Sequence, residues 1–311
     1  MREIRIGLCG TSWDYKQSLV PKIIETIAGK ISWVSPKKAD LVIIGPFECY
    51  LSKQKRNLTP KILRKHDEKE TYLDNIKGIK LFHTNENIRS DKVKVDFSIS
   101  FDHTPNNPNN LRFPYWMEFI DWSKEGIVGQ ENPRFGRLIN QEELLRPLDT
   151  SHRKRELRAA FFTSHLNEPR REIYYLLNKL IPIDGYGAFF NDRIKSHSDS
   201  GIKKNEILEN YIFNLCPENS MFPGYNTEKI PEAFASGCIP ITWTVPGHNK
   251  DFNQGAYINL ALGSDLEFFK KNFNNRNELY SRFYDQSLLL NRIDLNKLFD
   301  FLMRVIKAAS S

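Results

Sequence analysis

Three cationic residues lie in the first turns of two predicted helices. Lys229 falls in the first turn of a helix predicted over residues 227–236, and Arg170 and Arg171 fall in the first turn of another. A cation there opposes the helix dipole, and a bound anion would remove the conflict. Two such sites in one domain could bind one diphosphate from two sides. The alternatives are that Lys229 lies in water and that either arginine pairs with a neighbouring glutamate.

A carboxylate and a histidine follow two other predicted strands, at positions that suit a general base. Glu86 lies in T-N-E-N directly after the strand predicted over residues 79–83, and His103 follows the strand predicted over residues 97–101. Residues of these types can take a proton from an attacking hydroxyl. A solvated or capping glutamate and a histidine satisfied by its neighbours are the plainer interpretations.

The first helix belongs to a strand–helix–strand unit over residues 211–246. Its parts are a strand over 211–216, a loop of turn-forming residues over 217–226, the helix, which Gly237 is placed to stop, and a strand over 239–243. Open α/β sheets bind ligands at the carboxyl ends of their strands. The loop and the helix start are therefore the expected ligand site.

The same alternation runs along the whole chain and predicts an α/β fold with parallel sheets. A length of 311 residues allows two domains, and a polar stretch rich in Gly, Pro and Arg places their boundary near Ser151, which divides the chain into 1–150 and 151–311. The other predicted strands span residues 4–9, 31–34, 40–44, 157–163 and 257–260, and the other predicted helices span residues 17–29, 203–210, 266–283 and 295–308.

Composition narrows the function classes. The net charge of +7 suits nucleic acid, an anionic membrane surface or a negatively charged nucleotide sugar. The charge is spread rather than striped, and no nucleic-acid-binding motif is present, so nucleic acid is disfavoured. The four cysteines form no C-x-x-C pair, which suits a reducing compartment. No signal peptide or membrane-spanning run is apparent, so a cytoplasmic protein is expected, and association with the inner face of a membrane stays open.

The segment 211–246 resembles the donor-binding signature of the α-1,3/4-fucosyltransferases of glycosyltransferase family 10. That signature is approximately F-N-L-C-F-E-N-S, a short loop, Y-x-T-E-K and A-x-x-x-x-x-I/V-P-I/V. The chain departs from it at Pro217, where an aromatic residue is usual, and at Thr242–Thr244, which replaces Y/W-W-G. The matching residues are Phe213, Asn214, Leu215, Cys216, Glu218, Asn219, Ser220, Tyr225, Thr227, Glu228, Lys229, Ala233, Ile239, Pro240 and Ile241.

The resemblance implies a GT-B architecture, in which two Rossmann-like domains face each other across a cleft. Residues 1–150 would bind the acceptor and residues 151–311 the donor, with the last helix packing back on the N-terminal domain. It further implies inverting transfer of L-fucose from GDP-β-L-fucose to a sugar hydroxyl, typically the 3-OH of N-acetylglucosamine or glucose in a glycan. Another GDP-deoxysugar as donor, or a non-catalytic nucleotide- or glycan-binding protein, is the alternative.

Roles for individual residues also follow from the resemblance. Glu86 would be the base, and Arg171 would contact the donor pyrophosphate. The segment from Arg112 to Trp116 resembles one near the acceptor cleft of the family, although its aromatic residues alone indicate only a cluster. No D-x-D motif is present, so cations of the protein would replace a metal, and no obligatory cofactor is expected. The implied donor-binding residues are Arg171, Glu218, Asn219, Tyr225, Glu228 and Lys229, and the implied acceptor-side residues are Arg112, Tyr115 and Trp116. His103 is a further possible acceptor-side residue by its position after a predicted strand.

Overall fold

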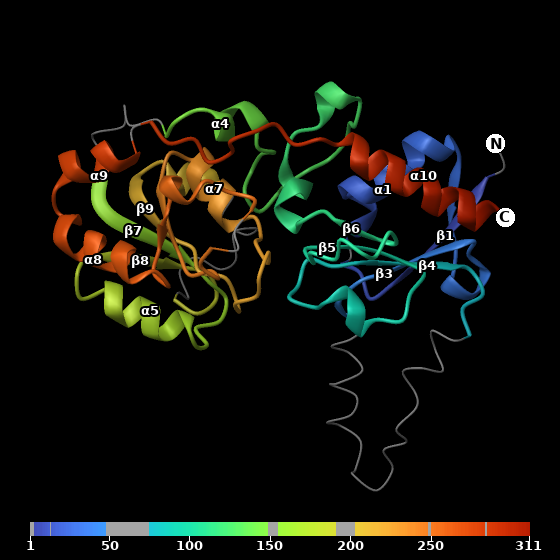
Figure 1. Cartoon of the computed structure of the whole chain (residues 1–311), viewed down its shortest axis with the longest axis horizontal. Coiled ribbons are helices and arrows are strands. Elements are labelled where there is room, and N and C mark those ends of the chain that lie inside the picture. The colour runs from blue at the N-terminus through green and yellow to red at the C-terminus, as the bar shows by residue number, and fades with distance from the viewer. Residues whose placement is uncertain are drawn as a thin grey trace, which may run out of the picture. The chain divides into compact units, whose positions relative to one another are not determined.

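The chain forms two compact units, each built around its own parallel sheet (Figure 1). The computed structural model describes residues 3–12, 14–47, 75–148, 155–190, 203–247, 250–283 and 285–311. Unit 1 comprises Met1–Glu118, Trp122–Gln130 and Asp294–Ser311, and unit 2 comprises Phe119–Asp121 and Glu131–Ile293. The predicted α/β class with two parallel sheets is confirmed.

Unit 1 has a six-stranded sheet in the order β2-β1-β3-β4-β5-β6, with every neighbouring pair parallel. The apolar strand β3 is buried along its whole length, as expected for a strand covered on both faces. The strands are β1 (Ile4–Cys9), β2 (Ile31–Trp33), β3 (Leu41–Ile44), β4 (Ile79–His83), β5 (Phe97–Ser100) and β6 (Asn110–Arg112).

Two helices from opposite ends of the chain pack together in unit 1: α1 (Leu19–Ala28) and α10 (Asn296–Ser310) (Figure 1). The buried residues of α10 recur every three or four positions, which gives the helix one apolar face. That face reaches the sheet, where Phe301 makes an edge-to-face ring contact with Phe97 of β5. The end of the chain is therefore part of unit 1.

Unit 2 has a five-stranded sheet in the order β11-β10-β9-β7-β8, again parallel throughout. Its strands are β7 (Glu156–Phe162), β8 (Ile183–Tyr186), β9 (Tyr211–Leu215), β10 (Ile239–Thr242) and β11 (Ile258–Asn259). Its helices are α4 (Gln141–Leu145), α5 (Arg170–Leu177), α6 (Lys204–Leu208), α7 (Lys229–Ala235), α8 (Gly263–Asn272) and α9 (Arg276–Phe283).

Short 3-10 helices complete the described chain. They are η1 (Tyr15–Gln17), η2 (Pro36–Lys38), η4 (Ser90–Lys92), η5 (Tyr115–Phe119), η6 (Ser123–Glu125) and η7 (Gln254–Ala256). None of the described helices combines the length and the apolar character needed to cross a bilayer.

The division between the units lies at Gln130 and Glu131, before the boundary predicted near Ser151, which is outside the described residues. Residues after Glu131 belong with unit 2 because their side chains bond to α7. The Asn132 amide donates to Glu232 at 3.1 Å, and the Arg137 guanidinium donates to the carbonyl of Ala235 at 3.1 Å. Contacts distant in sequence thus decide the division.

Two predicted helices differ in detail. The helix predicted over 266–283 is two helices, α8 and α9, separated by a turn in which the amide of Asn275 donates to the carbonyl of Asn272. Helix α7 begins at Lys229 rather than at Thr227, whose hydroxyl is bonded elsewhere. It ends as predicted, since Gly237 has a positive φ of 76°.

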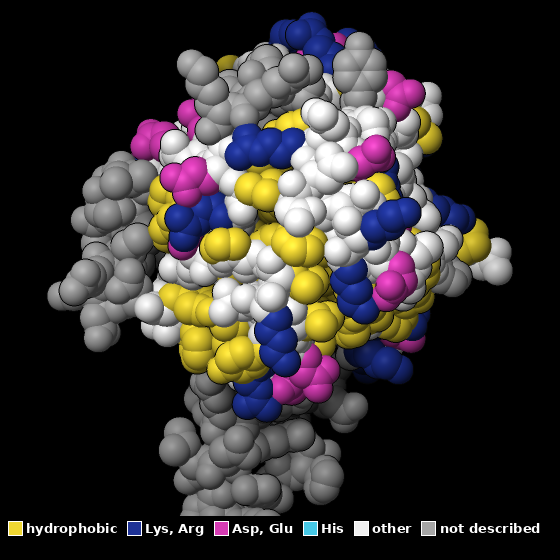
Figure 2. All heavy atoms as spheres, turned by 90° about the vertical axis from the view of Figure 1, so that its left-hand side faces the viewer, with side chains coloured by type: hydrophobic (Ala, Val, Ile, Leu, Met, Phe, Trp, Pro, Cys, Tyr) yellow, Lys and Arg dark blue, Asp and Glu magenta, His cyan; other side chains and the backbone are white. Residues whose placement is uncertain are grey.

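Figure 2 shows one face of unit 2, the side on which α8 and α9 lie in Figure 1. Lys and Arg side chains on this face stand in separate groups, with acidic and hydrophobic side chains between them. The described part of the face therefore has no continuous basic stripe of the kind that follows a nucleic-acid backbone.

Candidate functional site

Lys229 is held at the start of α7 by a buried carboxylate. Glu218, in the loop after β9, is 1% exposed and accepts from Lys229 Nζ at 2.9 Å. The same carboxylate accepts from the backbone amide of Thr227 at 2.7 Å and from its hydroxyl at 2.9 Å. An anion of the protein itself therefore already pairs with this lysine, in addition to the bound phosphate that the sequence predicts there.

The ammonium group of Lys229 stays charged in this setting. Burial alone would lower the pKa of Lys229, but Glu218 and Glu228 raise it above its ordinary value. The side chain keeps 19% of its surface exposed, so Lys229 is not fully covered by the described residues. Glu218 therefore orients a cation that remains available to a second anion.

Glu228, next to Lys229, is a stable anion. Burial would raise its pKa, but the charges of Lys229, Lys204 and Arg134 hold it at about 2. Lys204, from α6, is itself buried and forms an ion pair with Glu232 of α7 at 2.6 Å. A carboxylate fixed in this way can accept hydrogen bonds from hydroxyl groups, as binding a ribose would require.

The two arginines that follow β7 are used differently. Arg171 is 57% exposed and pairs with Glu168, with Arg171 Nε 2.6 Å from Glu168 Oε1. Arg170 donates to the hydroxyl of Thr163 at 3.1 Å and lies close enough to Lys229 for its charge to oppose that of the lysine. Arg170 is therefore within electrostatic reach of Lys229, whereas Arg171, the pyrophosphate contact that the resemblance implies, pairs with Glu168 at the surface.

The other residues expected near the donor lie in the loop between β9 and α7. Tyr225 is 4% exposed and its amide donates to Phe222 in a turn, whereas Asn219 is exposed. The amide of Asn226 donates to Asp251 at 2.9 Å, which ties this loop to the segment after β10. The loop is thus fixed at both ends by side chains within unit 2.

In unit 1, Glu86 lies in the loop directly after β4, as predicted. The Thr84 hydroxyl accepts from the Glu86 amide at 3.0 Å and donates to the Glu86 carbonyl at 2.9 Å. The amide of Ile88 donates to the same carbonyl at 2.7 Å. These bonds hold the backbone of Glu86 in a tight turn. The half-buried Glu86 side chain extends from this turn.

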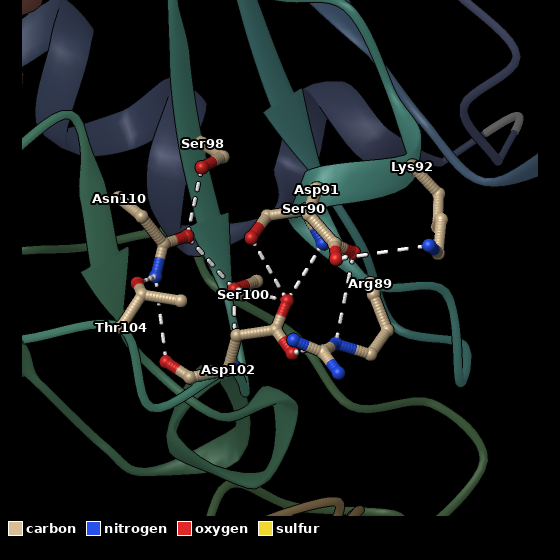
Figure 3. Close-up of polar contacts among 9 residues, drawn as sticks. All are labelled: Arg89, Ser90, Asp91, Lys92, Ser98, Ser100, Asp102, Thr104 and Asn110. Carbon is tan, nitrogen blue, oxygen red and sulfur yellow. Dashed lines mark hydrogen bonds and ion pairs between the residues drawn. The ribbon is translucent and has the colours of Figure 1, made fainter. Parts of the chain in front are cut away.

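The far end of the Glu86 loop is anchored by Asp102, a 1% exposed residue just after β5 (Figure 3). Its carboxylate accepts from Arg89 Nε at 2.9 Å, from the Ser90 amide at 2.6 Å and from the Ser90 hydroxyl at 2.8 Å. Figure 3 shows a second centre at Asn110, whose amide group bonds Ser98, Ser100 and Thr104. The loops after β4 and β5 are therefore held as one piece.

This network predicts that Asp102→Asn lowers turnover by about tenfold, because an amide nitrogen would face donors that now meet a carboxylate. The variant should keep its affinity for GDP if unit 2 binds the donor, as the resemblance implies. Steady-state kinetics with calorimetric GDP titration measures both. Asp91→Asn is the matched control, since Asp91 is half exposed and pairs with Arg89 at only 3.7 Å. Equal loss in both variants would contradict an anchoring role for Asp102.

The residues expected on the acceptor side are spread over three segments. His103 is exposed, directly after Asp102, and Arg112 is half-buried at the end of β6. Tyr115 and Trp116 lie in η5, where Trp116 is 1% exposed and belongs to the core. The ring of Trp116 is therefore covered by protein, in line with the simpler interpretation of this cluster as core.

The sequence pattern assigns no role to Lys204 or Asp102. Lys204 stands in a short helix among other charged residues, and nothing in the sequence marks it as buried. Asp102 follows a predicted strand, a position that also directed attention to its neighbour His103. The position after a strand was a usable signal for Asp102, whereas only the fold identifies Lys204.

Two family profiles match the chain. The one described as "Glycosyltransferase family 10 (fucosyltransferase) C-term" matches residues 151–285, and the one described as "Alpha-(1,3)-fucosyltransferase FucT N-terminal domain" matches residues 62–119. Together they cover more than half of the chain. The first contains the cluster around Lys229, and the second contains Glu86 and Asp102.

Curated relatives include an alpha-(1,3)-fucosyltransferase, FucT, from Helicobacter pylori, 28% identical over 238 residues. That match covers 67% of this chain and 47% of the relative. A putative fucosyltransferase from Acanthamoeba polyphaga mimivirus is 26% identical over 154 residues, covering 46% of this chain and 26% of the relative. The chain thus spans less than half the length of either relative.

Solved structures share the fold. A crystal structure of an alpha1,3-fucosyltransferase superposes with a TM-score of 0.68 at 22% identity, over 99% of this chain and 90% of that one. A structure of an alpha1,3-fucosyltransferase with GDP-fucose gives a TM-score of 0.64 at 22% identity, over 99% and 91% of the two chains. With the signature residues in place and both family profiles matched, the chain belongs to glycosyltransferase family 10.

Proposed function

We propose that the protein is an inverting α-1,3-fucosyltransferase that moves L-fucose from GDP-β-L-fucose to a hydroxyl of a glycan, the 3-OH of N-acetylglucosamine or glucose. The observation that carries the proposal is the cluster at the carboxyl ends of β7 and β9, where Lys229 pairs with Glu218 at 2.9 Å and lies 3.8 Å from the ionised Glu228, within electrostatic reach of Arg170. Two cations suit a diphosphate, and the adjacent carboxylate suits the ribose hydroxyls.

The proposed reaction is a single displacement. The acceptor oxygen attacks C1 of the fucosyl group as the bond from C1 to the GDP oxygen breaks, and the hydroxyl proton passes to the Glu86 carboxylate. GDP leaves with an added negative charge, which Lys229 and Arg170 would stabilise in the transition state. Attack from the face opposite the leaving group inverts the anomeric centre. Cations held by the protein would supply the charge that a metal supplies in other transferases.

The proposal extends to the partners and the compartment. The partners are a nucleotide sugar and an oligosaccharide acceptor. Cys216 and Cys238 are buried free thiols. Free thiols suit a reducing environment, which supports a cytoplasmic location.

A donor competition experiment tests the function. The purified protein is offered GDP-fucose, GDP-mannose and UDP-galactose in separate reactions with EDTA present, with N-acetyllactosamine or lactose as acceptor. Fucosylated product from GDP-fucose alone is the expected result. Transfer from GDP-mannose instead would replace fucose by another sugar, a result that the departures at Pro217 and Thr242–Thr244 would then explain. GDP binding with no transfer from any donor would indicate a binding protein.

The two arginines give a paired prediction. Arg170→Ala is expected to weaken GDP binding by about tenfold or more, because it removes a charge that faces the proposed diphosphate. Arg171→Ala, the matched control on the neighbouring position, should change the dissociation constant by less than about twofold, because Arg171 pairs with Glu168 at the surface. Isothermal titration with GDP distinguishes them. A larger loss of GDP affinity in Arg171→Ala than in Arg170→Ala would instead assign the diphosphate contact to Arg171.

A further inference from the structure

Unit 1 contains a buried polar cluster that the proposed reaction does not use. Tyr15 Oη lies 2.6 Å from His83 Nδ1, and His83 Nε2 lies 3.5 Å from Glu118 Oε1. Their exposed fractions are 8%, 4% and 5%, respectively. The three side chains come from η1, the last position of β4, and η5.

The cluster is incompletely satisfied. Glu118 Oε2 accepts from the backbone amide of Leu19 at 3.1 Å, at the start of α1. Among the described residues, neither His83 Nε2 nor Glu118 Oε1 has a hydrogen-bond partner, because their separation is too long for a normal bond. Buried polar groups left in this state cost stability, and apolar residues would fill the same space at less cost. Such an arrangement is more typical of functional sites than of cores.

The position of the cluster suggests what it does. His83 immediately precedes Thr84, the residue whose hydroxyl fixes the backbone of Glu86. Glu118 lies in the same 3-10 helix as Tyr115. Tyr115 belongs to the segment that is expected on the acceptor side. A displacement of His83 would therefore be passed directly to the Glu86 turn.

We infer that Glu118 acts through His83 as a positioning residue for the turn that carries Glu86. The inference rests on the proposed function, because it is Glu86 as base that makes the position of this turn matter. Glu118 is itself fixed by the amide of Leu19, so it provides a reference point that does not belong to the loop. Tyr15 holds the other nitrogen of the His83 ring and sets its rotation.

The protonation states of the three side chains at pH 7 follow from their burial. Burial raises the pKa of Glu118 to about 8 and lowers the pKa of His83 to about 4, so both are neutral at pH 7. Burial also raises the pKa of Tyr15 well above its ordinary value, which keeps its hydroxyl protonated and able to donate to His83 Nδ1 in the tautomer that the inference assigns. His83 then carries its proton on Nε2, facing Glu118. Among the described residues, Tyr115 is a further titratable group near the cluster, and its phenol interacts electrostatically with that of Tyr15.

Ionisation of Glu118 would disturb this state. A carboxylate would attract the Nε2 proton of His83 and shorten the present 3.5 Å separation. Because His83 ends β4, the movement would reach Thr84 and Glu86. Turnover is therefore expected to fall as the pH rises through about 8.

Two variants of Glu118 and a control test the inference at pH 7. Glu118→Gln, which keeps the shape of the protonated acid, should retain turnover within about threefold. Glu118→Ala should lower turnover by about tenfold or more without changing the Michaelis constant for the donor. Glu125→Ala, which removes an exposed glutamate of the same unit, should leave turnover unchanged. Wild-type turnover in a folded Glu118→Ala variant would overturn the inference.

If Glu118→Ala does not fold, the dependence of turnover on pH tests the inference instead. The wild-type protein should lose turnover above pH 8, and Glu118→Gln should not. An alkaline fall of equal size in both proteins would overturn the positioning role, because it would belong to another group.

Hydrogen exchange separates this inference from the proposed function. Amide exchange over residues 84–90, measured by mass spectrometry at pH 7, should accelerate in Glu118→Ala and not in Glu118→Gln, while peptides of unit 2 stay unchanged. This readout needs no activity. A wild-type protein that makes no product from any GDP-sugar would refute the proposed function, whereas unaltered exchange over this segment would refute the inference.

The same group gives a prediction for stability. A carboxyl whose folded pKa of about 8 lies above its unfolded value of 4.5 stabilises the fold fully below pH 4.5, and this contribution is lost as the pH rises to 8. The lowered pKa of His83 acts in the opposite direction, below pH 6.5. Between pH 6.5 and 8, the ratio of folded to unfolded wild-type protein should fall about tenfold relative to Glu118→Gln. Urea denaturation at both pH values measures this ratio, and parallel curves would contradict the assignment.

Discussion

Glu86→Gln is expected to lower the turnover number for fucosyl transfer by about 100-fold or more, with GDP affinity unchanged. The amide has the shape of the carboxylate but cannot take the proton of the acceptor hydroxyl. The turn itself should persist, because Thr84 and Ile88 bond only the backbone of Glu86. Product formation under saturating donor, together with GDP titration, measures the two quantities.

Glu125→Gln serves as the control for this variant, since it makes the same change at an exposed site in unit 1. Turnover of Glu86→Gln within a few-fold of the wild-type value would remove Glu86 from the role of base. His103, which is exposed in the loop after the next strand, β5, would then be the next candidate to substitute.

Lys229→Met is expected to raise the dissociation constant for GDP by about 100-fold, because it removes the cation that Glu218 orients. It should also reduce stability by about 3 kcal/mol, since Glu218 is left as a buried charge without its ammonium partner. Isothermal titration and urea denaturation report the two effects separately.

A double variant separates these two contributions. Lys229→Met combined with Glu218→Gln removes both charges, so stability should largely return while GDP affinity stays low. The control is Lys270→Met in α8, which breaks an exposed pair with Glu267 and should affect neither property measurably. Recovery of GDP affinity in the double variant would mean that Lys229 serves only to neutralise Glu218.

The position of a candidate site residue can be predicted from the sequence where it depends only on the end of one strand or the start of one helix. The position of Glu86 in the loop after β4 follows from the sequence, because the apolar run of β4 ends at His83 and polar residues follow at once. Lys229 was placed in the first turn of its helix because an apolar strand, turn-forming residues and Gly237 frame it. In these cases the local periodicity and the turn chemistry act in the same direction as the fold.

What could not be predicted depends on contacts between distant segments. Arg170 and Arg171 occupy one helical turn with similar neighbours, and only the direction of each side chain separates the one near Lys229 from the one paired with Glu168. The strand β6 has only three residues, which is too short for its side-chain alternation to be recognised among the neighbouring Pro and Asn residues. Its pairing with β5 defines it as a strand. Glu118 looks like any glutamate in an aromatic segment, since its burial against Leu19 joins residues 99 positions apart.

The most direct test of the account is the structure of the product. The wild-type protein is incubated with GDP-β-L-fucose and N-acetyllactosamine in the presence of EDTA, and the trisaccharide is examined by NMR. An α-linked fucose on the 3-OH of N-acetylglucosamine is the predicted result, because inversion of a β-linked donor yields an α-glycoside. A β-linked fucose, or the absence of fucosylated product from a protein that binds GDP, would contradict it.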